Sequence, residues 1–317
     1  MMKKTLLLIL LGLFALGSMA EKNITLKTGA KMKVYLPEDN VANGRAVVLC
    51  PGGGYSYLAD ANEGTDWAPY FNELGYAVAV LYYRMPQMHY TTYPLDDVTE
   101  AVLYLRRKSD QGQWNLSGKC VGVMGFSAGG HVASTLATHA TTESGARPDF
   151  QILFYPVITM EPSYTHMGSH DNLLGVPTTE EKELLYSNEK QVTDETPVAF
   201  ITYASDDSTV PVANSTNYAA ALAEHGVSAY TKAYPSGGHG FGWYKASFAY
   251  HDDLLAELTA WLNGLDEVLP NGVEEIPTGE AQVPLGIYTL DGRAVGKDWN
   301  QLPAGVYVRD GEKTLKR

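Results

Sequence analysis

Cysteine, basic side chains and long apolar runs are all scarce in this sequence. Only Cys50 and Cys120 are cysteine among its 317 residues, so at most one disulfide can form within the chain. Lys and Arg number 23 against 36 Asp and Glu, an acidic balance that argues against nucleic acid or an anionic membrane as a partner. The longest apolar run, 6–16, is too short to span a bilayer comfortably. These shortages favour a neutral or soluble substrate and no membrane insertion.

The first 20 residues have the pattern of a secretory signal peptide. Lys3 and Lys4 precede the apolar run, and small residues at 17–20 offer a cleavage site. We therefore expect an exported protein, periplasmic, on the cell surface or extracellular, that begins near Glu21. Without the two lysines the chain has 21 basic and 36 acidic side chains, a formal charge of −15.

Export would permit a disulfide, but the two cysteines are predicted to lie too far apart. Cys50 ends one apolar segment, and Cys120 stands five residues before the end of the segment expected beside it. At ~3.3 Å per residue this offset is ~16 Å, whereas a disulfide needs Cα atoms within ~7 Å. Both cysteines are expected to be small core residues.

The strongest motif is Gly-Phe-Ser-Ala-Gly at 125–129. It lies between the apolar run 120–124 and a helix-like stretch that starts at Gly130. A G-x-S-x-G sequence where a strand meets a helix is typical of a strained turn that lifts the serine hydroxyl clear of a sheet. Ser127 is therefore the predicted nucleophile.

An acid and a histidine follow in the order expected of a catalytic triad. The apolar segment 197–203 is followed by Asp206 and Asp207, and the segment 229–234 is followed by His239 among glycines. We prefer Asp207 because it stands three residues before the Val-Pro at 210–211, and we leave Asp206 as a turn or helix-capping alternative. The predicted triad is Ser127, Asp207 and His239.

Three consecutive glycines follow the first buried strand. Gly52, Gly53 and Gly54 come directly after the apolar segment 45–50 and Pro51. Such a loop can bring backbone N–H groups close to a ligand, as an oxyanion hole requires. The N–H groups of Gly53, Gly54 and Ala128 are the predicted donors, and a flexible surface turn is the alternative.

The rest of the chain alternates between strand and helix patterns. Strands are expected at 23–28, 31–36, 45–50, 76–82, 119–124, 150–156, 197–203 and 228–234, and helices at 94–107, 130–140, 211–224 and 247–262. This alternation predicts the α/β class, with a mostly parallel sheet covered by helices on both faces. The 45% apolar content suffices for one such domain, which we place at 21–268.

One long excursion, 158–194, is expected to form a lid over the site. It carries His166 and His170, whose i, i+4 spacing raises the question of a metal site, and a short charged helix near 179–186. Residues 167–169 make the histidine segment a poor helix, so helix-terminal and loop hydrogen bonding is favoured over a metal. We predict neither metal nor cofactor.

These motifs together resemble those of one enzyme family. Its marks are Pro-Gly-Gly-Gly-Tyr at 51–55, Leu-Tyr-Tyr-Arg at 81–84, the segment 122–131, Arg-Pro-Asp-Phe at 147–150, Tyr-Pro-Val-Ile at 155–158, and the Asp207 and His239 motifs. Over about 30–265 the chain resembles secreted α/β-hydrolase esterases related to acetylxylan esterases and dual feruloyl and acetyl esterases. The resemblance implies the α/β-hydrolase fold and deacylation of carbohydrate esters.

Two departures from that family bear on substrate choice. Pro51 stands where lipase-like relatives have histidine, which favours the carbohydrate-esterase branch. Asn62-Glu63-Gly64 stands where many relatives read His-Glu-Gly, which puts one substrate contact in doubt. The expected partner is an acetylated or feruloylated plant polysaccharide or oligosaccharide, while the acyl group, the hydroxyl position and the oligomeric state stay open.

Two aromatic residues are candidates for binding the sugar. Tyr55 follows the glycine loop and Trp243 follows the His239 loop, so both are expected at the rim, where a flat ring can stack on a pyranose. The alternative is that either ring only packs the loop that carries it.

Other function classes remain as alternatives. A serine exopeptidase would share the triad but normally carries a large N-terminal propeller, and a lipase would need a more apolar lid than one with charges at 180–183. A non-catalytic carbohydrate-binding relative would be expected to lose triad or glycine-loop residues.

The tail 269–317 is predicted to be a small β-rich unit. Asn-Gly or Asp-Gly turns at 271–272, 291–292 and 310–311 flank short alternating segments. Its pattern resembles C-terminal sorting segments of the type IX secretion route in Bacteroidetes-like bacteria, with a packed hairpin of no sorting role as the alternative.

Overall fold

The computed structural model describes residues 20–265, apart from 87, 117–119 and 245–247, and short strands between 287 and 316. The chain divides into two compact units, Met1–Pro270 and Asn271–Arg317. Residues 1–19 of the proposed signal peptide lie outside the described residues.

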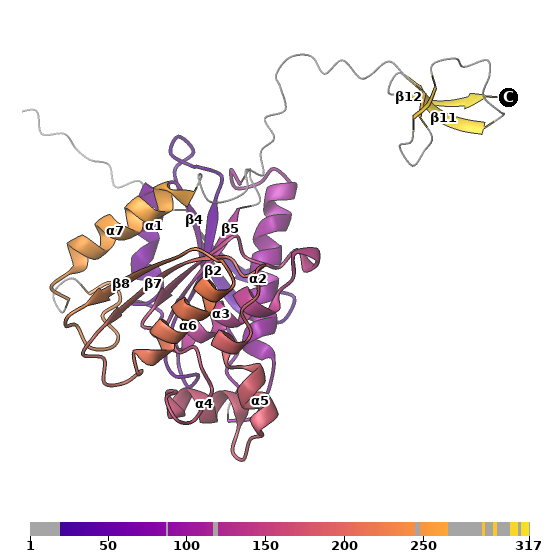
Figure 1. Ribbon diagram of the computed structural model, residues 1–317. Helices are drawn as coiled ribbons and strands as arrows, with labels where there is room; N and C mark the ends of the chain where they lie inside the picture. The colour runs from indigo at the N-terminus through magenta and orange to yellow at the C-terminus, as the bar shows by residue number, and fades with distance from the viewer. Residues whose placement is uncertain are drawn as a thin grey trace, which may run out of the picture. The chain divides into compact units, whose positions relative to one another are not determined.

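The first unit is built on an eight-stranded sheet of order β1-β2-β4-β3-β5-β6-β7-β8 (Figure 1). The strands are β1 Ala20–Thr25, β2 Lys31–Leu36, β3 Ala46–Cys50, β4 Ala77–Tyr82, β5 Val121–Phe126, β6 Phe150–Phe154, β7 Val198–Ala204 and β8 Ala229–Tyr234. β1 and β2 form an antiparallel hairpin and β2 runs antiparallel to β4, whereas the pairs from β4 through β8 are parallel. The predicted α/β class with a mostly parallel sheet is confirmed.

Helices cover both faces of this sheet. They are α1 Ala68–Glu73, α2 Tyr93–Asp110, α3 Ala128–His139, α4 Met167–Leu174, α5 Glu180–Leu185, α6 Ala213–Glu224 and α7 His251–Asn263, with 3₁₀ turns η1 Thr65–Trp67, η2 Thr142–Ser144 and η3 Asn188–Lys190. Side chains of α2, α3 and α6 share one apolar cluster with the sheet, and those of α1 and α7 share the other. Every residue of β3 and β5 is buried, as expected of central parallel strands packed on both faces.

The strand register explains the state of the cysteines. Cys50 on β3 lies opposite Gly125 on β5, so Cys120 stands five residues back along the neighbouring strand. Neither cysteine forms a disulfide, in agreement with the predicted offset.

Two local predictions were incomplete or wrong. α1 follows the glycine loop and was not expected; its apolar face is short, and Pro69 in its first turn was its one clear signal. The histidine segment forms a helix, α4, whereas residues 167–169 predict a poor one. His166 is its N-cap, and the ring Nδ1 accepts the Ser169 N–H at 3.2 Å.

The second unit contains the strands β9 Ile287–Tyr288, β10 Ala294–Gly296, β11 Gly305–Arg309 and β12 Glu312–Lys316. They pair antiparallel in the order β10-β9-β11-β12.

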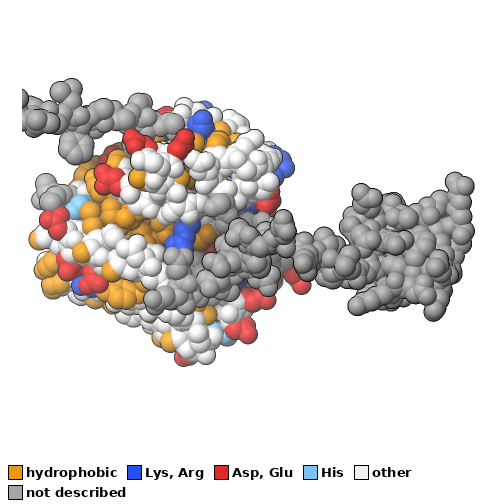
Figure 2. Space-filling model, turned by 90° about the horizontal axis from the view of Figure 1, so that it is seen from above, with side chains coloured by type: hydrophobic (Ala, Val, Ile, Leu, Met, Phe, Trp, Pro, Cys, Tyr) orange, Lys and Arg blue, Asp and Glu red, His pale blue; other side chains and the backbone are white. Residues whose placement is uncertain are grey.

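The surface agrees with the acidic composition. On the face seen in Figure 2, Lys and Arg side chains lie singly among acidic and uncharged ones. Among the described residues, no helix is long and apolar enough to cross a membrane.

Candidate active site

Ser127 stands on the sharp turn between β5 and α3. Its backbone has φ 51° and ψ −122°, a conformation that L-residues rarely adopt and that often marks a functional site. A Cβ on Gly125 would collide with the Gly129 carbonyl, and one on Gly129 would collide with the Cys50 carbonyl. The two glycines therefore permit the close approach that raises the serine above the sheet.

The structure brings the three predicted triad residues into one hydrogen-bonded chain. His239 Nε2 lies 2.8 Å from Ser127 Oγ, and its Nδ1 lies 2.7 Å from Asp207 Oδ2. Because a carboxylate only accepts, Nδ1 carries the proton and Nε2 is available to accept the serine proton. Each residue follows the carboxyl end of a different parallel strand, β5, β7 or β8.

Asp207 is held as an ionised acceptor. Burial opposes its ionisation, but the hydrogen bond and charge of His239, with N–H donors from Val210 and Thr209, keep the pKa of Asp207 below its ordinary value. Its Oδ1 accepts both N–H groups at 2.9 Å. Asp206 instead accepts the Gly238 N–H at 2.8 Å and anchors the loop before the histidine.

The glycine loop borders the same cavity as the serine. This cavity, of about 640 Å³, is lined by Gly53, Gly54, Ser127 and His239 among others. Ala128 follows the serine as the first residue of α3. Among the described hydrogen bonds, none is donated by the backbone N–H of Gly53, Gly54 or Ala128, so these groups are available to a ligand.

The excursion after β6 contributes a wall of this cavity. His166, Gly168 and Asn172 line it, and the Asn172 amide donates to the Gly54 carbonyl at 2.7 Å. Burial and the neighbouring His239 charge lower the pKa of His166, with Asp207 opposing. The segment predicted to be a lid therefore contacts the glycine loop through α4.

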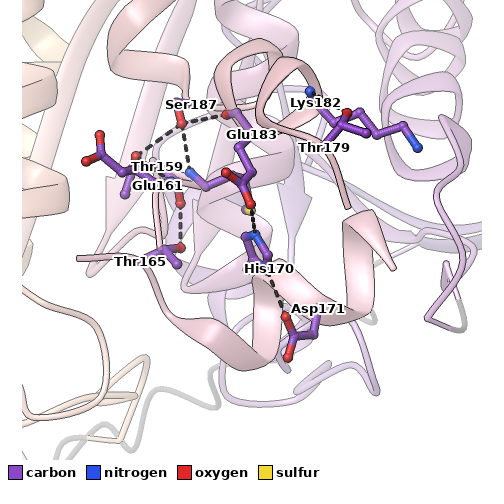
Figure 3. A network of polar contacts seen from close by, with 10 residues as sticks. Thr159, Glu161, Thr165, His170, Asp171, Thr179, Lys182, Glu183 and Ser187 are labelled. Atoms are coloured by element: carbon purple, nitrogen blue, oxygen red, sulfur yellow. Dashed lines mark hydrogen bonds and ion pairs between the residues drawn. The ribbon is translucent and has the colours of Figure 1, made fainter. Parts of the chain in front are cut away.

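His170 does not point to a metal. Its two ring nitrogens lie 2.8 Å from Asp171 Oδ1 and 3.1 Å from Glu183 Oε1, and the second contact joins α4 to α5 (Figure 3). Among the described residues, no group of three or more His, Cys, Asp or Glu side chains is placed to hold a metal ion. Hydrogen bonding within the excursion accounts for the histidine pair.

The two aromatic residues predicted at the rim lie elsewhere. Tyr55 is only 2% exposed, and its hydroxyl lies 2.8 Å from His131 Nδ1, so its expected contact with sugar is wrong. Trp243 is half-buried and packs edge-on against Trp67 at 5.0 Å and His251 at 5.1 Å between ring centroids. Neither residue lines the cavity in the part of the chain described.

The cavity region has other aromatic and polar residues to which the sequence analysis assigned no role. Tyr57 and Tyr244 line it and are 64% and 53% exposed. Glu63 also lines it but is buried, and Tyr155 packs edge-on against the His239 ring at 4.8 Å. Tyr57 stands two residues after Tyr55, so the sequence offers two tyrosines near the glycine loop. The one farther from the glycines is the one that lines the cavity.

Comparison with known proteins gives the family. The family model described as BD-FAE matches residues 32–222. An acetylxylan esterase from Xylanibacter ruminicola is 40% identical over 240 residues, which are 74% of this chain and 48% of that protein. An endo-1,4-beta-xylanase B from Butyrivibrio fibrisolvens is 38% identical over 218 residues, 65% of this chain and 34% of that protein. The chain thus spans about half or less of these curated relatives.

A solved structure confirms the fold. An acetyl ester-xyloside bifunctional hydrolase from Caldicellulosiruptor lactoaceticus superposes with a TM-score of 0.68 at 31% identity, covering 75% of this chain and 88% of that one. The expected α/β-hydrolase fold is therefore correct. Since the family model spans more than half of the sequence, this chain belongs to the BD-FAE family.

Proposed function

We propose that this protein is an exported serine esterase that deacylates carbohydrate esters, above all acetyl groups on xylan or xylo-oligosaccharides. The observation that carries the proposal is the hydrogen-bonded chain Ser127–His239–Asp207 at a cavity shared with the glycine loop. The similarity to an acetylxylan esterase and to an acetyl ester-xyloside hydrolase supports the substrate class.

Acylation is the first half of the proposed mechanism. His239, oriented by Asp207, takes the Ser127 proton as Oγ attacks the ester carbonyl carbon. The carbonyl π electrons move to oxygen, and the N–H groups of Gly53, Gly54 and Ala128 stabilise that oxyanion. The tetrahedral intermediate then expels the sugar oxygen, which receives the proton from His239.

Deacylation repeats these steps with water. His239 takes a proton from water as the water oxygen attacks the acyl-enzyme carbonyl. Collapse of the second intermediate breaks the Ser127–acyl bond, returns the proton to Oγ and releases the carboxylic acid. Each step uses a side chain or N–H of this chain, so no metal or cofactor is required.

A feruloyl esterase or another small-ester hydrolase of the same fold is the second candidate. A cavity of about 640 Å³ is within the range that holds a drug-sized ligand, so it is large enough for an aromatic acyl group as well as for acetyl. The lipase alternative would need an apolar cover, whereas α5 carries Glu180, Glu181 and Glu183. The peptidase and carbohydrate-binding alternatives gain no specific support.

One experiment separates the two acyl groups. Release of acetate and of ferulate is measured from matched acetylated and feruloylated xylo-oligosaccharides, with Ser127→Ala as the control. The proposal predicts faster acetate release that the variant abolishes. Faster ferulate release would favour the second candidate, and no ester hydrolysis by the wild-type chain would contradict both.

Export is the remaining part of the proposal. Residues 1–20 are proposed to direct secretion, and the tail 269–317 to act as the sorting segment it resembles. In a host with the type IX route, deletion of the tail should leave the enzyme in the periplasm with its activity intact. Unchanged delivery to the cell surface would leave the tail as a β-rich appendage without a sorting role.

A further inference from the structure

A second carboxylate, Glu63, is buried at the edge of the active-site cavity. It is 4% exposed and lies 11 residues beyond Gly52. Glu63 Oε2 accepts the Gly52 N–H at 2.8 Å, and Oε1 accepts the Tyr155 hydroxyl at 2.8 Å. One carboxylate therefore contacts both the start of the glycine loop and the residue that follows β6.

Tyr155 extends this contact to the histidine loop. Its hydroxyl oxygen accepts the Gly242 N–H at 3.0 Å while its proton is donated to Glu63. The tyrosine ring lies edge-on against the His239 ring. The tyrosine backbone is held at φ 36°, and its N–H donates to the Thr202 carbonyl at 2.7 Å. The ring beside the histidine is thus fixed by its hydroxyl and by its backbone.

The neighbouring Asn62 holds the same loop. Its Nδ2 donates to the Gly240 carbonyl at 3.1 Å, and its Oδ1 accepts the Trp243 N–H at 2.8 Å and the Tyr244 N–H at 3.1 Å. Residues 62 and 63 therefore fix the loop on the carboxyl side of His239 at several points. Asn62 therefore helps to position this loop.

The partners of Glu63 differ from those of Asp97, another buried carboxylate. Asp97 is paired with the Arg84 guanidinium at 2.8 Å, a strong cationic partner. Glu63 has a backbone N–H and a hydroxyl as hydrogen-bond partners. His239 is the cation-forming group whose charge acts on it.

Glu63 has its full set of contacts only as a carboxylate. A proton on either oxygen would face a donor, since both oxygens accept hydrogen bonds. Burial raises the pKa of Glu63 above its ordinary value, and the Tyr155 hydroxyl, the Gly52 N–H and the His239 charge oppose that rise. Tyr83, the residue after β4, is another titratable group near this carboxylate. Burial raises the pKa of Tyr83, and the Cys50 and Glu63 charges add to that rise.

We infer that Glu63 is a positioning residue of the acyl-transfer site: its carboxylate fixes the glycine loop and, through Tyr155, the histidine ring, and its charge stabilises the imidazolium formed during catalysis. This inference rests on the proposed serine mechanism. It assigns Glu63 no proton transfer, because its two oxygens are occupied by Gly52 and Tyr155.

Two variants and one control test the inference in the full chain. Glu63→Gln removes the charge and turns one acceptor into a donor, and Tyr155→Phe removes only the hydroxyl while keeping the ring. Asp149→Asn is the control, because its carboxylate also accepts a backbone N–H, from Val121, and pairs with Arg106, but at the opposite end of the strands. The readouts are the melting temperature, the rate at which a fluorophosphonate probe labels Ser127, and the pH profile of kcat/KM for an aryl acetate.

We expect Glu63→Gln to slow labelling by about 10–100-fold, because small misplacements of reacting groups carry costs of this size. The acidic limb of the kcat/KM profile of this variant should move to lower pH, because the variant lacks a carboxylate that must be ionised for activity. Tyr155→Phe should move the limb to higher pH, because the hydroxyl that helps to keep Glu63 ionised is lost. Asp149→Asn should lower the melting temperature and leave both other readouts unchanged.

Labelling and an acidic limb that are unchanged in folded Glu63→Gln would overturn the inference. If that variant does not fold, Tyr155→Phe decides: wild-type labelling with an unmoved limb overturns it, and slower labelling with the limb at higher pH supports it. Failure of the proposed substrate class is distinguishable, because wild-type labelling of Ser127 does not depend on sugar esters. A wild-type Ser127 that the probe does not label would overturn both.

Discussion

The carboxyl ends of the parallel strands and the 158–194 excursion border one cavity, but different interactions hold them in place. The strands β5, β6 and β7 carry fully buried apolar side chains such as Met124, Ile152 and Phe200. The positions of these strands follow from their backbone pairing. The excursion is held by polar side chains instead. Asn214 accepts the N–H groups of Ile158 and Thr159. Ser187 accepts the Met160 N–H and the Thr159 hydroxyl (Figure 3).

This difference separates chemistry from access. The strand ends determine where Ser127, Asp207 and His239 meet, since each follows a strand whose register is set by its neighbours. We expect the excursion to influence what can approach them, because α4 supplies a wall of the cavity. Substitutions at the strand ends should therefore change turnover, and those in the excursion or at the cavity rim should change stability or substrate affinity.

The largest effect is expected at the nucleophile. Ser127→Ala should lower kcat by ~10⁶ because triad members act as a unit. The protein should stay folded, since the buried strand and helix around the turn keep their packing. Steady-state kinetics on an aryl acetate, with circular dichroism as the folding control, measure this. More than a tenth of the wild-type activity would contradict the assignment of Ser127.

The two adjacent aspartates of one loop are expected to differ strongly in their effect on turnover. Asp207→Asn should lower kcat by ~10⁴, because the orientation and charge that support His239 are lost. Asp206→Asn should cost far less, since an amide oxygen can still accept the Gly238 N–H that Asp206 holds. Parallel kcat measurements decide the matter, and a larger loss at Asp206 would mean that the acid has been misassigned.

A buried histidine connects the strand-end region to the excursion, and we expect it to make the free energy of unfolding fall in acid. His131 on α3 is 1% exposed, and its Nε2 lies 2.7 Å from the carbonyl oxygen of Tyr186, at the end of α5. Burial lowers the pKa of His131 to about 4, opposed by the hydrogen bond to that carbonyl and assisted by His139. The unfolded chain, with the ordinary value of about 6.5, binds the proton more readily.

The contribution of neutral His131 to the free energy of unfolding is therefore fully present above pH ~6.5, and it is lost as the pH falls toward 4. The difference of roughly 2.5 units corresponds to about 3 kcal/mol. His131→Gln should reduce the slope of the unfolding free energy against pH in this window, measured by urea denaturation. His225→Gln, at an exposed position, is the control, and an unreduced slope in His131→Gln would show that other groups carry the dependence.

The sequence predicted the strand-end region well because its signals are local and apolar. The G-x-S-x-G turn, the buried runs and the glycine loop each predict one backbone feature, and the α/β fold follows from their order. The excursion was harder to predict, since its order depends on side-chain hydrogen bonds between distant residues, such as Ser187 with Thr159 at 3.2 Å. The same reason hid Glu63, whose partners Gly52 and Tyr155 lie 11 and 92 residues away.

The rim was the least predictable part, because proximity in sequence does not determine which side of a loop a ring occupies. Tyr55 has φ 60° and turns inward to His131, whereas Tyr57 turns outward. Trp243 packs inward on Trp67, and the next residue, Tyr244, is exposed. In both loops the aromatic residue that reaches the cavity lies one or two positions beyond the one expected.

The smallest effect is expected at this rim. Tyr57 is exposed and borders the cavity beside Gly53, so its ring can stack on a sugar ring of a bound oligosaccharide. Aromatic contacts of this kind contribute about 1 kcal/mol, which corresponds to a roughly fivefold change in affinity. Tyr57→Ala should raise KM for acetylated xylo-oligosaccharides by this factor and leave turnover of a small aryl acetate unchanged, because only the longer substrate reaches the rim.

Trp243→Ala is the matched comparison, since it also removes an aromatic ring but from the packed side of the rim. It should lower the melting temperature and reduce activity on both substrates alike, because Trp243 packs against Trp67 and His251 beneath the histidine loop. If Trp243→Ala instead raised KM only for the oligosaccharide, and Tyr57→Ala had no such effect, the prediction from the sequence that Trp243 stacks on a sugar would be correct. The excursion and the rim would then still affect substrate affinity, and the strand ends turnover, but Trp243 and not Tyr57 would make the contact with the sugar.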